Sequence, residues 1–138
     1  MGLTGLLIMQ VCMSTQFGHP GDKHGGRSPT IYFKRPVSPT DMGIAHRTWP
    51  MGRRVLVKNL RTGKQAFARV IDRGPWGMVD DKGWFNPRDK SKPGNRARGA
   101  RLIKKVGEEK AYRGCADLTP ALVRALHHNR KERVQITL

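Results

Sequence analysis

Alternating apolar and polar positions predict short β-strands in much of the sequence. In residues 53–60, the apolar side chains of Val55 and Val57 alternate with basic or larger ones, as on a strand with one buried face. Residues 61–64 contain a Thr-Gly turn, and residues 65–72 return as a second strand. Two strands joined by such a turn predict a hairpin of a small, largely antiparallel barrel.

Other segments fit the same mainly β architecture. Residues 3–17 and 132–138 alternate in the same way and predict the first and the closing strand, and residues 102–106 predict a short extra strand. Residues 18–41 are punctuated by Gly and Pro and predict a loop. Residues 119–129 predict a helix that opens with Thr as N-cap and Pro at the first helical position.

The strand at residues 65–72 ends in an acid that is followed by a forced turn. Gly74 and Pro75 cannot continue a central strand, because Pro has no N–H and Gly weakens a strand. Asp72 therefore lies at a strand exit, where its side chain can face a groove, and Arg73 beside it can hold it ionised. Taken alone, an Asp before a Gly-Pro turn is most often only a turn residue.

Four segments in a fixed order give this acid a wider context. They are residues 45–52 (AHRTWPMG), 54–60 (RVLVKNL), 68–77 (ARVIDRGPWG) and 116–122 (ADLTPAL). In this order they resemble the double-psi β-barrel of the rare lipoprotein A family, with a weaker match at residues 14–18. The resemblance covers about residues 45–77 and 114–138, and the same barrel also carries expansins, barwin-like proteins and inactive members.

The resemblance implies a six-stranded double-psi β-barrel with one or two short helices and a groove. Asp72 and Asp117 match the acids that line this groove in rare lipoprotein A and expansins. We therefore expect Asp72 to be the acid/base of a lytic transglycosylase-like glycan cleavage, with Asp117 raising its pKa by like-charge proximity. His46 would orient the substrate or tune Asp72. The expected substrate contacts are Thr15, Arg73 and Trp76.

Each of these residues also has an ordinary structural interpretation. Asp117 would be an N-terminal helix residue that interacts favourably with the backbone dipole, His46 would bond a loop backbone, and Thr15 would be a common strand residue. The family carries an acid shortly before the Ala-His pair, whereas the nearest acid here, Asp41, does not align with it.

Neither the histidines nor the cysteines show the spacing of a metal site. His19, Asp22 and His24 are close in sequence, but a Gly-rich loop gives them no fixed geometry, so we expect solvated side chains, no metal and no cofactor. Cys12 and Cys115 form no CxxC motif, which leaves two free buried thiols. The resemblance offers an alternative, because it puts both cysteines beside the same groove, where they could form a disulfide.

The N-terminus does not match a secretory signal. Residues 1–13 have no basic start and no small-residue cleavage site, Cys12 is not in a lipobox, and the apolar run is too short to span a bilayer. A location outside the cytoplasm, facing the cell wall, would then require another route, such as a virion or lysis of the host cell.

Residues 76–114 separate the two parts of the resemblance. The 39 residues of this basic insertion hold 11 basic and 5 acidic side chains. Loops longer than roughly 15 residues in a compact domain are usually functional or disordered. We expect a single domain over residues 1–138 whose insertion binds an anionic polymer, covers the groove, packs on a neighbouring protein or extends into solvent as a flexible arm.

The net charge of +17 adds a preference for anionic partners. The sequence leaves three functions open: a peptidoglycan-active enzyme encoded by a bacteriophage or its host; a non-catalytic barrel that binds wall polymer or forms part of a larger assembly such as a phage virion or tail; and a nucleic-acid binder. The third ranks last, because the sequence has no helix-turn-helix, zinc finger or RNA-binding signature.

Overall fold

The barrel is built from strands on both sides of the basic insertion. The computed structural model describes residues 8–20, 22, 28–75, 77–79, 85–87, 101–102 and 114–138. The barrel strands are β1 (Met9–Gln16), β2 (Gly43–His46), β3 (Arg54–Asn59), β4 (Gln65–Asp72), β8 (Gly114–Leu118) and β9 (Glu132–Thr137), and the described helix is α1 (Pro120–Leu126).

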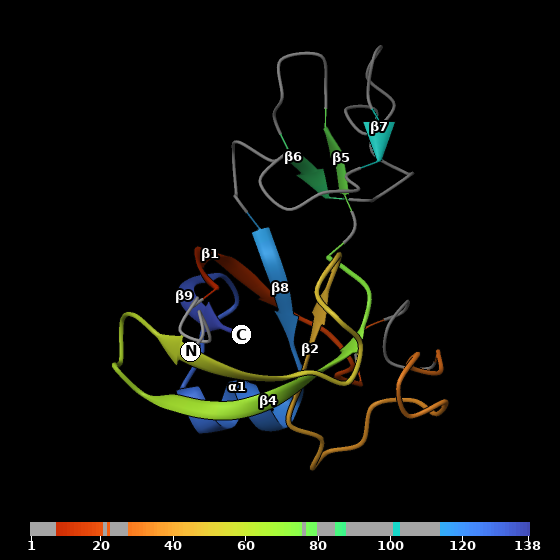
Figure 1. The fold of residues 1–138 in the computed structure, drawn as a ribbon, viewed down its shortest axis with the longest axis horizontal. Coiled ribbons are helices and arrows are strands. Elements are labelled where there is room, and N and C mark those ends of the chain that lie inside the picture. Colours follow the sequence, from red (N-terminus) through yellow and green to blue (C-terminus); the bar gives the residue numbers. More distant parts are fainter. Residues whose placement is uncertain are drawn as a thin grey trace, which may run out of the picture.

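These six strands close in the order β1-β8-β2-β4-β3-β9 (Figure 1). The pairs β1–β8 and β2–β4 are parallel, and the other four neighbouring pairs are antiparallel. The prediction of a mainly β, six-stranded barrel with one or two short helices is confirmed, because the described residues form a closed six-stranded barrel and one short helix. Closure leaves no barrel strand with an unpaired edge.

Three further strands fall within the insertion. They are β5 (Gly77–Val79), β6 (Phe85–Pro87) and β7 (Arg101–Leu102), and they form a separate sheet in the order β6-β5-β7. β7 overlaps the start of the strand predicted for residues 102–106, and residues 103–106 lie outside the described part of the chain.

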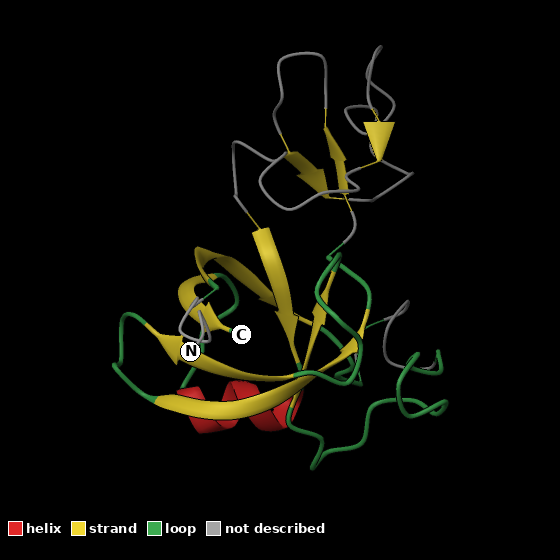
Figure 2. Cartoon of the chain, in the orientation of Figure 1, coloured by secondary structure: helices red, strands yellow, loops and turns green. Residues whose placement is uncertain are grey.

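Alternation on the barrel strands fills the core with small aliphatic side chains. Val55 and Val57 of β3 and Val134 and Ile136 of β9 have at most 1% of their surface exposed. Leu122 and Leu126 of α1 belong to the same cluster, and Figure 2 shows the helix lying along the barrel beside β4. Burying each such side chain stabilises the fold by roughly 1.5–3 kcal/mol.

A second apolar cluster holds the long loop before β2. Phe17, Ala45 and Ile71 are buried together, and Phe33 and Val37 from the loop pack against them. The described residues of the segment predicted as a loop, 18–41, form neither helix nor strand, which confirms that prediction for the part that is described. The cluster therefore ties this loop to β2 and β4.

Cys12 of β1 and Cys115 of β8 form a disulfide bond. Their Cα atoms are 5.8 Å apart, within the range that a disulfide requires. The predicted proximity of the two cysteines is therefore confirmed, and the bond rather than a pair of free thiols is what the structure contains. The bond joins the neighbouring parallel strands β1 and β8, which stand on opposite sides of the insertion in the sequence.

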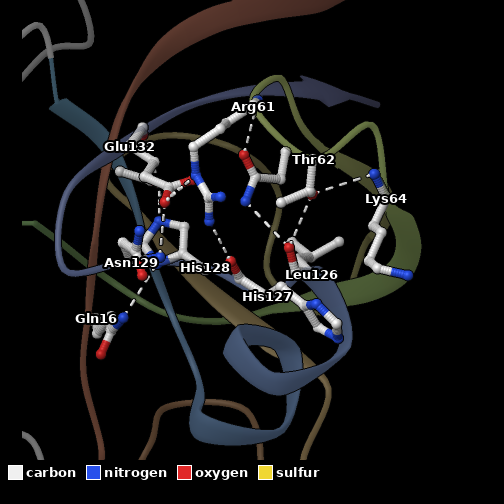
Figure 3. Close-up of polar contacts among 11 residues, drawn as sticks. Gln16, Arg61, Thr62, Lys64, Leu126, His127, His128, Asn129 and Glu132 are labelled. Atoms are coloured by element: carbon white, nitrogen blue, oxygen red, sulfur yellow. Dashed lines mark hydrogen bonds and ion pairs between the residues drawn. The ribbon is translucent and has the colours of Figure 1, made fainter.

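A buried polar network fixes the turn after α1 (Figure 3). The Ser14 hydroxyl donates to the backbone oxygen of Glu132 (2.9 Å) and lies 2.7 Å from Nε2 of His128. Gln16 reaches the other ring nitrogen of His128, and Arg61 forms an ion pair with Glu132 (2.8 Å). The network connects β1, the turn after β3, the end of α1 and β9.

The helix ends three residues earlier than the sequence predicts. The last helical residue is Leu126, because His127 adopts the left-handed conformation with φ of 49°. The next residue, His128, donates its backbone N–H to the oxygen of Val123 (3.0 Å), which closes the helix end.

Candidate functional site

Strand register places the two predicted acids on one row of the barrel. Thr15 of β1 pairs with Asp117 of β8, Asp117 pairs with Ala45 of β2, and Ala45 pairs with Asp72 of β4. Paired residues on neighbouring strands point to the same face, and strands lie about 4.8 Å apart. Asp72 and Asp117 are therefore two strand spacings apart, about 10 Å, with Ala45 of β2 between them on the row.

Asp117 has the environment of a proton-exchanging group. Burial raises its pKa to about 7; the hydrogen bond from the Thr15 hydroxyl to Oδ1 opposes this rise, as does the charge of Arg47, while Asp22 and Asp72 add to it. A carboxyl with a pKa of about 7 is about half protonated at neutral pH, which suits general acid–base chemistry.

The ordinary interpretation of Asp117, a residue of the first helical turn, does not match its position. Asp117 lies in β8, and α1 begins at Pro120. The hydroxyl of Thr119 donates to the backbone oxygen of Asp41 (2.6 Å) and accepts the N–H of Gly43 (3.1 Å). This pair of bonds ties the start of the helix to β2 and holds β8 in register beside it.

Asp22 and Arg47 add charge around the row, although the sequence assigned them no catalytic or binding role. The Asp22 carboxylate accepts the backbone N–H of Gly18 (2.9 Å), which folds the loop after β1 back toward Asp117. Arg47 is 5% exposed and donates to the backbone oxygen of Pro75 (2.9 Å). Arg47 stood inside the matched motif, but the sequence alone gave no sign that its guanidinium would be buried.

His46 is fully buried and bonded to protein through both ring nitrogens. Nδ1 accepts the backbone N–H groups of Thr48 (3.1 Å) and Trp49 (3.0 Å), and Nε2 lies 3.1 Å from Oε1 of Gln10. Since Nδ1 accepts, the proton of the neutral ring is on Nε2 and is donated to Gln10. Burial, with the charges of Arg47 and Arg73, lowers the pKa of His46 to about 4.

The Trp49 ring stacks on this imidazole with the ring centroids 4.5 Å apart. His46 therefore organises the loop between β2 and β3. The structural interpretation, a His that bonds a loop backbone, describes these contacts.

Arg73 points to the same loop. Its Nη1 donates to the backbone oxygens of His46 (3.1 Å) and Trp49 (2.5 Å). Among the described residues no ion pair joins Arg73 to Asp72, the acid it was expected to hold ionised. Asp72 is partly exposed at the end of β4, and Trp76, the third predicted substrate contact, lies outside the described residues.

Asp41, the acid nearest to the family's upstream position, is occupied elsewhere. Its carboxylate forms a two-pronged ion pair with Arg35 (2.8 and 3.0 Å) and accepts the N–H of Ser38 (2.8 Å). The hydrogen bond from Arg35 keeps the pKa of Asp41 below its ordinary value in spite of burial. Asp41 therefore stabilises the loop before β2.

The described residues form neither a metal-binding cluster nor a membrane-spanning helix. In the described ranges, no group of three or more His, Cys, Asp or Glu residues has an arrangement that could hold a metal ion; His24 lies outside them. No helix in the described part of the chain has the length and apolar character needed to cross a membrane.

Comparison with known proteins gives one partial likeness. No family model matches the chain. A curated protein of Nostoc sp. (strain PCC 7120), named as a probable endolytic peptidoglycan transglycosylase RlpA, is 45% identical over 56 residues. The match spans 41% of this chain but only 15% of that protein.

Proposed function

We propose that this barrel acts on peptidoglycan and cleaves its glycan strands as a lytic transglycosylase. The observation that carries the proposal is that Asp117, whose pKa burial raises to about 7, lies on the same row as a second acid, Asp72, with strand β2 between them. The partial likeness to a protein named as a peptidoglycan transglycosylase supports the choice of substrate.

Glycan cleavage needs a proton donor for the leaving oxygen and negative charge near the oxocarbenium-like centre. In a lytic transglycosylase the sugar's own hydroxyl replaces the attacking water, so one group can give the proton and take one back. The sequence assigned this role to Asp72. The burial of Asp117 favours the reverse assignment, with Asp117 as the proton donor and Asp72 as the carboxylate that stabilises the positive charge.

The contacts around the row suggest supporting roles. Thr15 fixes Oδ1 of Asp117, and among the described residues none donates a hydrogen bond to Oδ2, so this oxygen is the one we assign to a substrate. Arg73 and His46 act through the loop at residues 46–49, because their hydrogen bonds hold its backbone next to β8.

Incubation with purified peptidoglycan, followed by mass spectrometry for anhydro-muropeptides, tests the proposal. Asp117→Asn and Asp72→Asn should each abolish product while circular dichroism shows an unchanged fold. Asp41→Asn is the matched control, since it removes a carboxylate outside the row and should keep activity under conditions where it stays folded. Activity that survives Asp117→Asn but not Asp72→Asn would restore the original assignment.

A second candidate is a non-catalytic barrel that binds wall polymer or forms part of a larger assembly such as a virion. The engagement of Asp41 by Arg35 and Ser38 favours it, because no other described acid stands shortly before the Ala-His pair. Wild-type protein that co-sediments with peptidoglycan but releases no product, from intact or peptide-stripped glycan, would reject the enzyme and support this candidate.

A further inference from the structure

A row of paired residues, three of them large and apolar, crosses the outer surface of four barrel strands. Met9 of β1 pairs with Thr137 of β9, Thr137 pairs with Leu56 of β3, and Leu56 pairs with Phe67 of β4. Val57, Ala68 and Ile136, which stand next to Leu56, Phe67 and Thr137 in sequence, are at most 3% exposed, so the row faces outward. Met9 and Phe67, at the two ends of the row, are 52% and 54% exposed.

Basic side chains flank this row on both sides. Arg54 and Arg69 are direct cross-strand partners, and Lys58 stands two residues beyond Leu56 on the other side. Like charges placed opposite each other destabilise a strand pair, and a bound anion would relieve that repulsion. No Asp or Glu occupies an outward position on β1, β9, β3 or on β4 up to Arg69.

The two arginines are held in fixed orientations. The guanidinium carbon of Arg54 lies 3.8 Å from the centroid of the Phe67 ring, and Nη1 of Arg69 donates to the backbone oxygen of Gly52 (3.0 Å). A stacked guanidinium keeps its in-plane N–H groups available for two-pronged bonds to a carboxylate. The surface thus combines an apolar stripe with preoriented carboxylate binders.

We propose that this face is a docking surface for an extended acidic segment of a partner protein that carries acidic and apolar side chains on the same face. The row crosses three strand spacings, about 14 Å, which about four residues of extended chain can cover. Carboxylates of the segment pair with Arg54, Arg69 and Lys58, and its apolar side chains cover Met9, Leu56 and Phe67. A phosphate polymer would satisfy the arginines but offers no apolar group to the stripe. The proposal is independent of glycan cleavage.

Fluorescence anisotropy with the labelled six-residue peptide Leu-Leu-Glu-Glu-Leu-Leu, which carries leucine and glutamate on both faces when extended, tests the proposal on the full chain. Phe67→Ala should weaken binding by about fivefold, and the double variant Arg54→Gln/Arg69→Gln by at least tenfold, on the scale of other interface contacts. Both variants change exposed side chains, so each should still fold. Thermal unfolding of each variant checks this. The matched control, Lys34→Gln/Arg130→Gln, removes the same charge from exposed positions outside the row and should leave binding within twofold.

Several results would overturn the proposal. They are no measurable binding, equal weakening by the control double variant, equal binding of a peptide with serine in place of each leucine, and tighter Phe67-dependent binding of inorganic polyphosphate or oligothymidylate. Light scattering that shows a dimer dissociated by Phe67→Ala would assign the face to a second copy of this chain instead.

Discussion

At the scale of single residues, Asp117 carries a cost in stability that follows from its chemistry. The folded chain binds its proton up to a pH of about 7, whereas an unfolded Asp releases it near pH 4. Between these values the folded state binds more protons than the unfolded state, so the free energy of unfolding decreases as the pH rises.

Asp117→Asn should therefore stabilise the protein above pH 7, on the order of 2 kcal/mol, because the neutral amide does not lose a proton and still accepts the Thr15 hydroxyl. Urea denaturation of both proteins at pH 5 and pH 8 measures this difference. An equal difference at the two pH values would contradict the assigned pKa. The same variant should lose activity. Residues at functional sites often lower the stability of the fold because catalysis requires their unfavourable environment.

His46 should make the free energy of unfolding depend on pH in the opposite direction. Its pKa of about 4 is below the ordinary 6.5, so the unfolded state binds more protons between these values. The stability that neutral His46 provides is complete above about pH 6.5 and is lost as the pH falls toward 4. His46→Gln should show a flatter decline of the denaturation midpoint from pH 7 to pH 4 than the wild type. A parallel decline in both proteins would show that His46 is not the group responsible.

The site residues that sequence could find are those that stand in motifs. Asp72 and Asp117 were located by their neighbours along the chain, and strand register then brought them to one row. Which of them carries the proton could not be predicted, because burial of Asp117 depends on β1 and β2, which are distant in sequence. The approach of Asp22 and Arg47 to Asp117 has the same origin.

At the scale of elements, predictability followed the length and regularity of each segment. The hairpin of β3 and β4 was predicted to within a residue, because alternation and the turn at residues 61–64 act together. The strands β2 and β8 were not predicted. They have four and five residues, and the burial pattern of β2 shows no alternation. Pairing with the strands on both sides, rather than the local sequence, holds β2 and β8 in an extended conformation.

The end of α1 allows a stabilising change. His127 has a left-handed backbone with φ of 49°, which costs a residue with a side chain roughly 1–2 kcal/mol and costs Gly almost nothing. After allowing for the greater freedom of Gly in the unfolded chain, His127→Gly should stabilise the protein by about 0.5–1 kcal/mol. The bond from Arg61 to the backbone oxygen of this residue is kept.

Thermal unfolding measures this gain, and His128→Gly provides the contrast. That neighbouring variant should destabilise the protein, because it removes the side chain that contacts Ser14 and Gln16. Equal effects of the two changes would mean that backbone conformation at residue 127 is not strained.

At the scale of the whole molecule, the barrel closes without any strand from the insertion. Deleting residues 88–101 removes six basic side chains and one acidic side chain but no barrel strand. The shortened protein should keep its thermal unfolding temperature within a few degrees and should bind anionic wall polymer more weakly in a co-sedimentation assay. Unchanged binding would show that this part of the insertion makes no contact with the polymer.

The disulfide predicts how the protein responds to a cut. A specific protease site inserted between Gly94 and Asn95 should, after cleavage, give one band on a denaturing gel without reductant and two bands with it. Uncut protein and a Cys12→Ser/Cys115→Ser variant serve as controls, and the variant should give two bands in both conditions. Two bands from the cut wild type without reductant would show that the bond does not form in solution.

The feature behind this prediction has a broader consequence. Cys12 and Cys115 lie on opposite sides of the insertion, and four of the six barrel seams pair a strand from before it with a strand from after it. Once the backbone is cut there, the two halves still form a single covalent molecule whose β-ladders run between them. Proteolytic enzymes that attack the basic insertion would then convert one chain into a two-chain protein with the row of Thr15, Asp117, Ala45 and Asp72 intact, and only a reducing environment would separate its halves.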